Sequence, residues 1–233
     1  MTNPKLTQLT PDNSQIIFID HQPQMAFGVA SIDRQTLKNN TIALARAAAL
    51  FKIPTTITTV ESESFSGFAY PELLSMFPDT PILERTSMNS WDDQNVRNSL
   101  AAAGRKKVIV SGLWTGICDG MFALSAMLEG GYEIYLVSDA SGDTSKEAHD
   151  LAVQRLTQAG AVPVTTLQTI LEWQRDWARS EHYEGVMNIV LEHMGAYGMG
   201  ADYAATMVHK APQRGKHGPT RAPTPALPLL AAE

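Results

Sequence analysis

The 233-residue sequence contains a single cysteine, Cys118, and no apolar run near the roughly 20 residues that a membrane-spanning helix needs. One cysteine excludes an intrachain disulfide and is compatible with a reducing compartment. The net charge of −6 is spread along the chain, and no basic stripe indicates a nucleic-acid-binding surface. The N-terminal residues lack the apolar core of a secretory signal peptide. We therefore expect a cytoplasmic protein with neither a membrane nor a nucleic-acid partner.

The rest of the composition is that of an ordinary globular protein, with 44% hydrophobic and 18% charged residues. Short apolar segments alternate with segments whose apolar residues have helical spacing. This alternation predicts βαβ units and a mainly parallel sheet with helices on both faces, which is a three-layer α/β/α sandwich. The expected strands are residues 15–20, 54–60, 81–85, 107–111, 133–138 and 162–165, and the expected helices are residues 37–51, 71–77, 92–103, 117–129 and 145–159.

The pattern changes after Leu167, where tryptophan, methionine and valine residues indicate amphipathic helices. We expect one domain over residues 8–208, in which residues 167–208 form a helical extension. Such an extension can pack on a neighbouring subunit or on its own domain. Residues 209–233 are rich in proline and poor in apolar residues, so we expect a disordered or extended tail unless a partner holds it.

Cys118 lies just beyond the fourth expected strand, in the first turn of the following helix. Backbone N–H groups and the positive end of the helix dipole favour an anion at such a position. The sequence therefore predicts a thiol with a depressed pKa, which can act as a nucleophile. A lone cysteine is also commonly a small buried apolar residue, and its position alone does not decide between the two roles.

Two charged residues end other expected strands, so they belong to the same edge of a parallel sheet as Cys118. Asp20 ends an apolar strand, where a carboxylate is costly unless it is paired or functional, and it is the candidate base. Its alternative is a turn or helix-capping role. Arg85 can anchor Asp20 or stabilise a thiolate but cannot shuttle protons, and its alternative is a salt bridge at the rim. The coincidence of all three at one edge favours a catalytic site.

Three segments carry a more specific signal: Asp20-His-Gln, Arg85-Thr-Ser-Met-Asn-Ser-Trp91 and Gly112-Leu-Trp-Thr-Gly-Ile-Cys118. They resemble the signature segments of the isochorismatase-like cysteine hydrolases, most closely those of the YcaC-like branch, and the resemblance covers about residues 8–208. It implies a six-stranded parallel sheet of order 3-2-1-4-5-6. It also implies a triad of Asp20, Arg85 and Cys118, in which Arg85 stands where most of the superfamily has lysine.

The same resemblance implies a cis peptide bond between Trp114 and Thr115. In that arrangement the backbone from Thr115 to Cys118 would turn its N–H groups toward an oxyanion formed from the substrate. The residues that we expect to contact the substrate are Gln22, Phe27, Asn89, Trp91 and Trp114.

The nicotinamidases of this superfamily bind a metal through an aspartate and two histidines after the second strand. This sequence has Glu61 and Glu63 there and no histidine between His21 and His149, so we expect neither a metal nor another cofactor. The isochorismatase enzymes proper cleave an enol ether without a nucleophilic cysteine. The presence of Cys118 therefore favours cleavage of an amide-type C–N bond in a small molecule through a thioester acyl-enzyme.

Two other functions stay open. Cys118 could be a redox sensor in a catalytically idle scaffold, or the chain could be an oligomeric scaffold whose helical extension matters most. The resemblance implies a homo-oligomer, an octamer being one possibility. The glycine-rich run from Gly195 to Gly200 does not indicate a dinucleotide site, because it lies in the helical extension rather than after an N-terminal strand.

Overall fold

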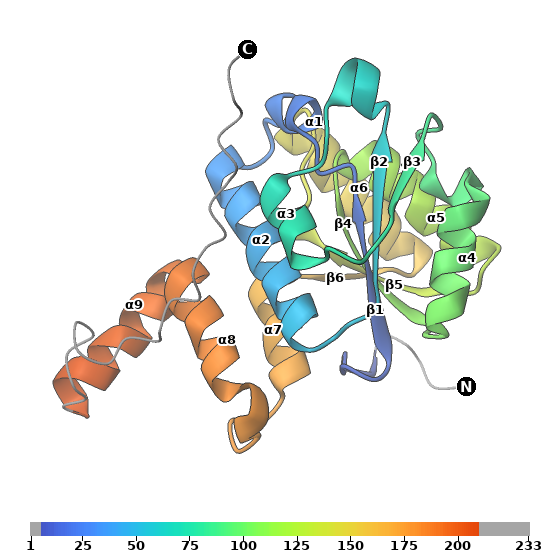
Figure 1. Ribbon diagram of the computed structural model, residues 1–233. Helices are drawn as coiled ribbons and strands as arrows, with labels where there is room; N and C mark the ends of the chain where they lie inside the picture. Colours follow the sequence, from blue (N-terminus) through green and yellow to red (C-terminus); the bar gives the residue numbers. More distant parts are fainter. Residues whose placement is uncertain (1–5, 210–233) are drawn as a thin grey trace, which may run out of the picture. The chain divides into compact units, whose positions relative to one another are not determined.

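The computed structural model describes residues 6–209 and contains a six-stranded sheet of order β3-β2-β1-β4-β5-β6 (Figure 1). Every neighbouring pair of strands in it is parallel, so the predicted strand order is confirmed and the sheet is entirely rather than mainly parallel. The strands are β1 (Ser14–Ile19), β2 (Thr55–Val60), β3 (Ile82–Arg85), β4 (Lys107–Gly112), β5 (Glu133–Val137) and β6 (Val162–Val164).

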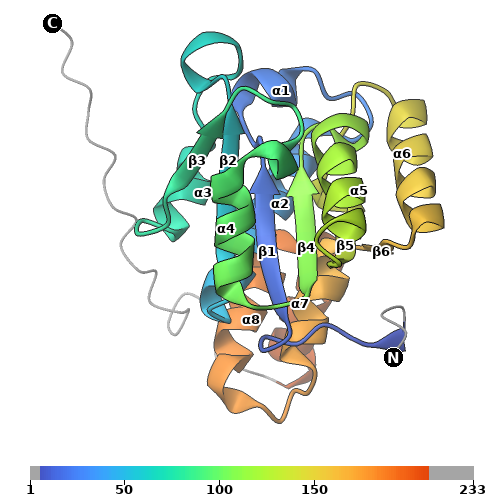
Figure 2. The ribbon, with the colours of Figure 1, turned by 90° about the vertical axis from the view of Figure 1, so that its right-hand side faces the viewer.

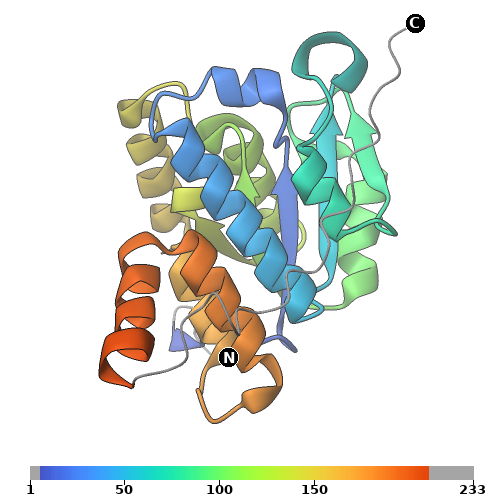
Figure 3. The same ribbon diagram turned by 60° about the vertical axis from the view of Figure 1, so that its left-hand side comes forward.

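Helices cover both faces of the sheet. Helices α4 (Gln94–Ala103) and α5 (Gly120–Leu128) lie in front of β1 and β4 in Figure 2. Helices α2 (Arg34–Leu50) and α3 (Pro71–Met76) cover the opposite face (Figure 3). The remaining helices are α1 (Pro23–Phe27), α6 (Lys146–Ala159), α7 (Thr166–Gln174), α8 (Ser180–His193) and α9 (Gly195–Tyr203), with short helical turns η2 (Ser62–Ser66), η3 (Ser90–Asp92), η4 (Thr115–Asp119), η5 (Ser138–Ala140) and η6 (Ala204–Val208).

The continuous apolar sequence of β1 follows from its central position. All six of its residues are buried, because β2 and β4 pair with its two edges and helices cover its two faces. Ile19 lies opposite Gly112 of β4, so β1 and β4 end side by side. The residues that follow these two strands are therefore neighbours at the carboxyl edge of the sheet.

Side-chain caps explain why the helices begin close to their predicted positions. The Asp33 carboxylate accepts the Thr36 N–H at 2.9 Å before α2, and Asp93 accepts the N–H groups of Asn95 and Val96 before α4. Helix α4 ends at Gly104, whose φ of 66° is the left-handed conformation that glycine adopts at low cost. Helix α1 was not predicted, because five residues are too few to show a helical period.

The helices after the sheet differ from the expected extension over residues 167–208. Trp173 of α7 is fully buried, its ring packs on Phe51 with 6.0 Å between centroids, and its indole N–H donates to the Ser14 hydroxyl at 3.0 Å. It therefore needs no neighbouring subunit to cover it. The described chain divides into two compact units, one up to Ile189 and one from Val190 onward, so α7 belongs to the unit of the sheet.

The expected tail lies outside the described residues except for His209. Over residues 6–209, none of the helices combines the length and the apolar character that crossing a bilayer requires.

Candidate active site

Three charged or nucleophilic side chains that come from different strands meet at the carboxyl edge of the sheet. Asp20 directly follows β1, Arg85 ends β3, and Cys118 lies in η4 after β4. Asp20 Oδ2 lies 2.6 Å from Arg85 Nη2, and the Cys118 thiol acts as a weak donor toward the same carboxylate. Asp20 is fully buried, and Arg85 and Cys118 are 5% and 2% exposed. The sequence prediction that these three residues share one edge agrees with this geometry.

Asp20 has a φ of 55°, in the left-handed region that most residues avoid. Aspartate tolerates this region better than most side chains, and the cost is on the order of 1 kcal/mol. The Asp20 N–H donates to Thr58 O at 3.0 Å, and Asp20 O accepts the Gln22 N–H at 2.7 Å. These main-chain bonds hold the residue at the point where the chain turns away from β1.

Burial controls the protonation of the Asp20–Cys118 pair. Burial raises the pKa of Asp20 from 3.8 to about 6, and the Arg85 charge opposes this rise. Burial also raises the pKa of the Cys118 thiol far above its usual range, and the Asp20 charge raises it further. The prediction of a depressed thiol pKa is therefore wrong, because burial and a neighbouring carboxylate outweigh the end of the helix. At pH 7 the site holds an ionised carboxylate beside a neutral thiol.

Arg85 is fixed by more than its ion pair with Asp20. Its Nη1 donates to the main-chain oxygen of Ser87, and its own main-chain oxygen accepts the Glu61 N–H at 3.1 Å. A guanidinium held from both sides cannot move away from the carboxylate. It therefore keeps a fixed positive charge at Asp20.

The turn before Cys118 contains a cis peptide bond between Leu113 and Trp114. The resemblance placed this bond one residue later, at Trp114–Thr115; the motif alone fixed the segment but not the bond. Three N–H groups of the turn are already engaged: Thr115 donates to Gly142 O at 2.9 Å, Gly116 to Asp143 Oδ2 at 2.7 Å, and Ile117 to Trp114 O at 3.0 Å. Of the predicted oxyanion donors, the N–H groups of Trp114 and Cys118 are those that stay candidates.

Gln22, which we expected to contact substrate, instead organises the loop after β2. Its side-chain amide donates to Val60 O at 3.0 Å and Gly67 O at 2.6 Å, and its side-chain oxygen accepts the Val60 N–H at 3.0 Å. The amide has no free group for a ligand, so we do not keep Gln22 among the proposed substrate contacts.

Asn89 and Trp91 are likewise engaged within the protein. Asn89 caps η3 by accepting the Trp91 N–H at 3.1 Å, and its amide donates to Asp92 and Ser125. The Trp91 indole is 6% exposed and donates to Glu129 at 2.8 Å. Both residues join η3 to α5, and neither is kept among the proposed substrate contacts.

Trp114 and Phe27 lie on segments next to the Cys118 turn. The half-buried Trp114 indole donates to Met25 O at 2.9 Å and packs so closely on Gly28 that a Cβ there would lie 2.7 Å from the ring. Phe27, at the end of α1, is 67% exposed. These two aromatic residues stay candidates for contacts with a substrate.

The sequence reasoning missed two buried ionisable residues that directly follow Asp20 and Cys118. His21 lies 2.9 Å from the Ser111 hydroxyl, which itself donates to Ala140 O, so the imidazole is the donor. Burial lowers the pKa of His21 to about 4 and keeps it neutral. Asp119 is fully buried, and neither carboxyl oxygen has a well-formed hydrogen bond among residues 6–209, although Ser141 lies nearby. Burial raises the Asp119 pKa well above its usual value; adjacency to the motif residues was the available signal.

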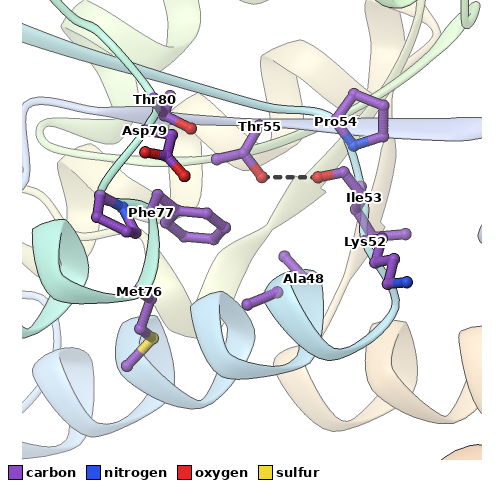
Figure 4. A pocket seen from close by; sticks show the side chains of 11 residues that line it. Ala48, Lys52, Ile53, Pro54, Thr55, Met76, Phe77, Asp79 and Thr80 are labelled. Atoms are coloured by element: carbon purple, nitrogen blue, oxygen red, sulfur yellow. Dashed lines mark hydrogen bonds between the residues drawn. The ribbon is translucent and has the colours of Figure 1, made fainter.

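Two cavities differ in their relation to this edge. One of about 370 Å³ lies at the opposite edge, between the start of β2 and the loop after α3, and Thr55 there donates to Ile53 O at 2.9 Å (Figure 4). The other, of about 650 Å³, is lined by residues of β2, η2, α3 and β3, among them Phe68, Glu84 and Arg85. Only the second shares a residue with the Asp20–Arg85–Cys118 cluster. No group of three potential ligands is arranged to hold a metal within the described chain.

Comparison with known proteins places these features in context. Residues 14–168 match the isochorismatase domain. The probable hydrolase YcaC of Escherichia coli is 34% identical over 198 residues, which are 84% of this chain and 93% of that protein.

Two solved structures are similar over most of their length. The octameric E. coli YcaC hydrolase of unknown specificity has a TM-score of 0.81 and 31% identity, over 85% of this chain and 97% of that one. YcaC from Pseudomonas aeruginosa, solved with hexane-2,5-diol and covalent acrylamide, has a TM-score of 0.80 and 32% identity, over 84% and 96% of the two chains.

Proposed function

The chain belongs to the isochorismatase family of hydrolases, and we propose that it uses Cys118 to cleave an amide-type C–N bond in a small molecule. The observation that carries this proposal is the buried contact of the Cys118 thiol with Asp20, whose carboxylate is paired with Arg85 at 2.6 Å. A nucleophile, a base and a fixed cation in contact are the parts that nucleophilic acyl transfer needs.

In the proposed reaction Asp20 takes the Cys118 proton while Sγ attacks the carbonyl carbon of the amide. The carbonyl oxygen becomes an oxyanion and accepts hydrogen bonds from the N–H groups of Cys118 and Trp114. The protonated Asp20 then gives its proton to the nitrogen, ammonia or an amine leaves, and a thioester stays on Cys118. Water attacks the thioester, Asp20 takes the proton of that water, and the acid and the free thiol are released.

The protonation states support this order of steps. Because burial raises the pKa of the Cys118 thiol, a free thiolate is scarce at neutral pH, and the proton must leave as the bond to carbon forms. The pKa of Asp20 near 6 suits this role, since the carboxylate is ionised at pH 7 yet basic enough to accept a proton. Arg85 contributes by holding that carboxylate in its charged form.

The P. aeruginosa YcaC structure with covalent acrylamide supports the proposal from outside this chain. Acrylamide is a small amide with an electrophilic carbon, and a related site therefore admits such a molecule next to a nucleophile. Cys118 is the only cysteine in this sequence, so we expect it to be the residue that such an amide modifies.

Ammonia release from a panel of small amides, nitriles and carbamoyl compounds tests the proposed function. The wild-type protein should release ammonia from at least one compound, and Cys118→Ala should release none while keeping its unfolding midpoint. The conservative control Ser125→Ala removes a hydroxyl on α5 that only meets Asn89, so it should keep the activity. Equal release by the wild type and Cys118→Ala would end the proposal.

A redox-sensing role fits the site less well. Oxidation of a thiol requires thiolate character and exposure, whereas Cys118 is 2% exposed and has a raised pKa. The single cysteine also provides no resolving partner within the chain. Peroxide treatment should therefore leave the Cys118 thiol titratable under conditions that oxidise a free exposed cysteine.

Assembly into a homo-oligomer is part of the proposal. The E. coli YcaC hydrolase is described as octameric, and this chain leaves Trp177 and Tyr183 more than 40% exposed. Exposed apolar side chains of this size commonly mark an interface. A sedimentation mass of several subunits is expected, and a 25.4 kDa monomer at micromolar concentration would contradict it. A cytoplasmic location stays an expectation from the composition.

A further inference from the structure

Asp143 connects the turn before Cys118 to the rest of the sheet edge. Its carboxylate accepts the Gly116 N–H at 2.7 Å through Oδ2 and the Thr144 N–H at 2.7 Å through Oδ1. The residue is only 4% exposed. Hydrogen bonds from main-chain N–H groups to a buried carboxylate are among the stronger ones in proteins.

The main chain around Asp143 binds two further segments. The Asp143 N–H donates to the Ser31 hydroxyl at 2.9 Å, and Asp143 O accepts the N–H groups of Ala30 at 2.9 Å and Ser31 at 3.2 Å. The neighbouring Gly142 O accepts the Thr115 N–H at 2.9 Å. Residues 142–143 thus join the loop after α1 to the Cys118 turn.

These contacts fix the direction of successive peptide groups in the turn. The N–H groups of Thr115 and Gly116 point toward residues 142–143, and the Thr115 hydroxyl lies 2.9 Å from His149 Nδ1 of α6. Gly116 approaches closely, since a Cβ there would lie 3.1 Å from Asp143 Oδ2. With two peptide groups held, the orientation of the Cys118 N–H two residues later is restricted.

We propose that Asp143 is a positioning residue, whose carboxylate holds Gly116 so that the Cys118 N–H points at the oxyanion of the reaction. This inference rests on the proposed function. It assigns no chemistry to Asp143 itself, which acts only through the main chain of the turn. Loss of its carboxylate lets the Gly116 peptide rotate, and the oxyanion then loses its preorganised donor.

Two thiol reagents separate positioning from mere stability. Acrylamide develops negative charge on its carbonyl oxygen when Cys118 adds to it, whereas methyl methanethiosulfonate reacts with the thiol without any carbonyl. Asp143→Ala should slow the acrylamide reaction by about 10–100-fold but the methanethiosulfonate reaction by no more than about threefold, because only the first needs the oxyanion donor. Asp143→Asn keeps an acceptor for Gly116 and should restore most of the acrylamide rate.

The matched control is Asp93→Ala. Asp93 also accepts two main-chain N–H groups, those of Asn95 and Val96, but it does so at the start of α4. This variant should lose stability without changing the ratio of the two reaction rates. If Asp143→Ala does not fold, the same ratio in Asp143→Asn carries the test, and a ratio equal to that of the wild type in both overturns the inference.

The test also separates this inference from the proposed function. A wild-type protein whose Cys118 reacts with neither reagent overturns both. A wild-type protein that reacts with acrylamide, together with an Asp143→Ala variant in which both reactions slow equally, overturns the positioning role alone.

Discussion

Replacing Arg85 by glutamine removes the cation beside Asp20 while leaving a polar side chain of similar length. The two charges are buried, and the joined atoms Nη2 and Oδ2 lie 2.6 Å apart. At an effective dielectric constant of about 20, charges about 4 Å apart interact by about 4 kcal/mol, which corresponds to about 3 pKa units. A nearby opposite charge commonly lowers the pKa of an aspartate by about 1–3 units.

Arg85→Gln should therefore raise the pKa of Asp20 from about 6 by about 1–3 units. The carboxylate must be ionised to take the Cys118 proton, so reactivity should rise through this pKa as the pH increases. At pH 7 the variant should react about 10–100-fold more slowly than the wild type, since each unit is a tenfold change in the ionised fraction.

The rate of Cys118 alkylation by iodoacetamide, measured against pH, reports this midpoint without a known substrate. Arg85→Lys keeps a cation and should hold the midpoint near that of the wild type. Arg97→Gln makes the same charge change on α4, where Arg97 contacts Gln94 and the main chain of Trp91, and should not move it. An unchanged midpoint in Arg85→Gln, with the fold intact by circular dichroism, would refute the coupling of Arg85 to the proton acceptor.

Two further predictions concern stability. Burial raises the pKa of Asp119, so the folded state keeps a proton that the unfolded state releases above its lower pKa, and the free energy of unfolding falls as the pH rises through this range. Asp119→Asn removes this loss, so urea titrations should show it to be more stabilising at pH 8 than at pH 4; an equal effect at the two pH values would argue against a neutral acid. Trp173→Ala should lower the free energy of unfolding by about 3–5 kcal/mol, because it empties a fully buried site against Phe51. A loss below about 1 kcal/mol in the same titration would mean that α7 is not part of the core.

The fold could be predicted because its causes are local in the sequence. Apolar β-branched segments such as β1 and β4 alternate with capped helices, and parallel strands bring their carboxyl ends to one edge. The same rule placed Asp20, Arg85 and Cys118 together, since each follows or ends a strand. Position along strands therefore identified the cluster before any distance was known.

The protonation of the site could not be predicted, because it depends on burial by segments far away in the sequence. The helix end near Cys118 is visible in the sequence, whereas the exclusion of water from it and the contact with Asp20 are not. Likewise, the N–H groups of Thr115 and Gly116 are engaged by Gly142 and Asp143, which lie 27 residues further along the chain in each case. Sequence motifs indicate which backbone segment forms the site, but not which of its N–H groups are free.

Polar side chains near a motif were also over-interpreted as substrate contacts. Gln22 and Asn89 have the hydrogen-bonding groups that a binding site needs, but main-chain partners from other elements engage them. Buried amides are nearly always hydrogen-bonded, and the sequence does not say whether the partner is a ligand or the protein itself. Only the folded arrangement separates these two cases.

Acid-quench mass spectrometry with an amide that the protein hydrolyses tests the central claim most directly. Mixing, quenching and peptide mapping should find the acyl group of the amide on Cys118, formed together with released ammonia. Asp20→Asn should form this adduct far more slowly, because the thiol has lost its proton acceptor. Ammonia release without any adduct on Cys118, or an undiminished rate in Cys118→Ala, would contradict the account.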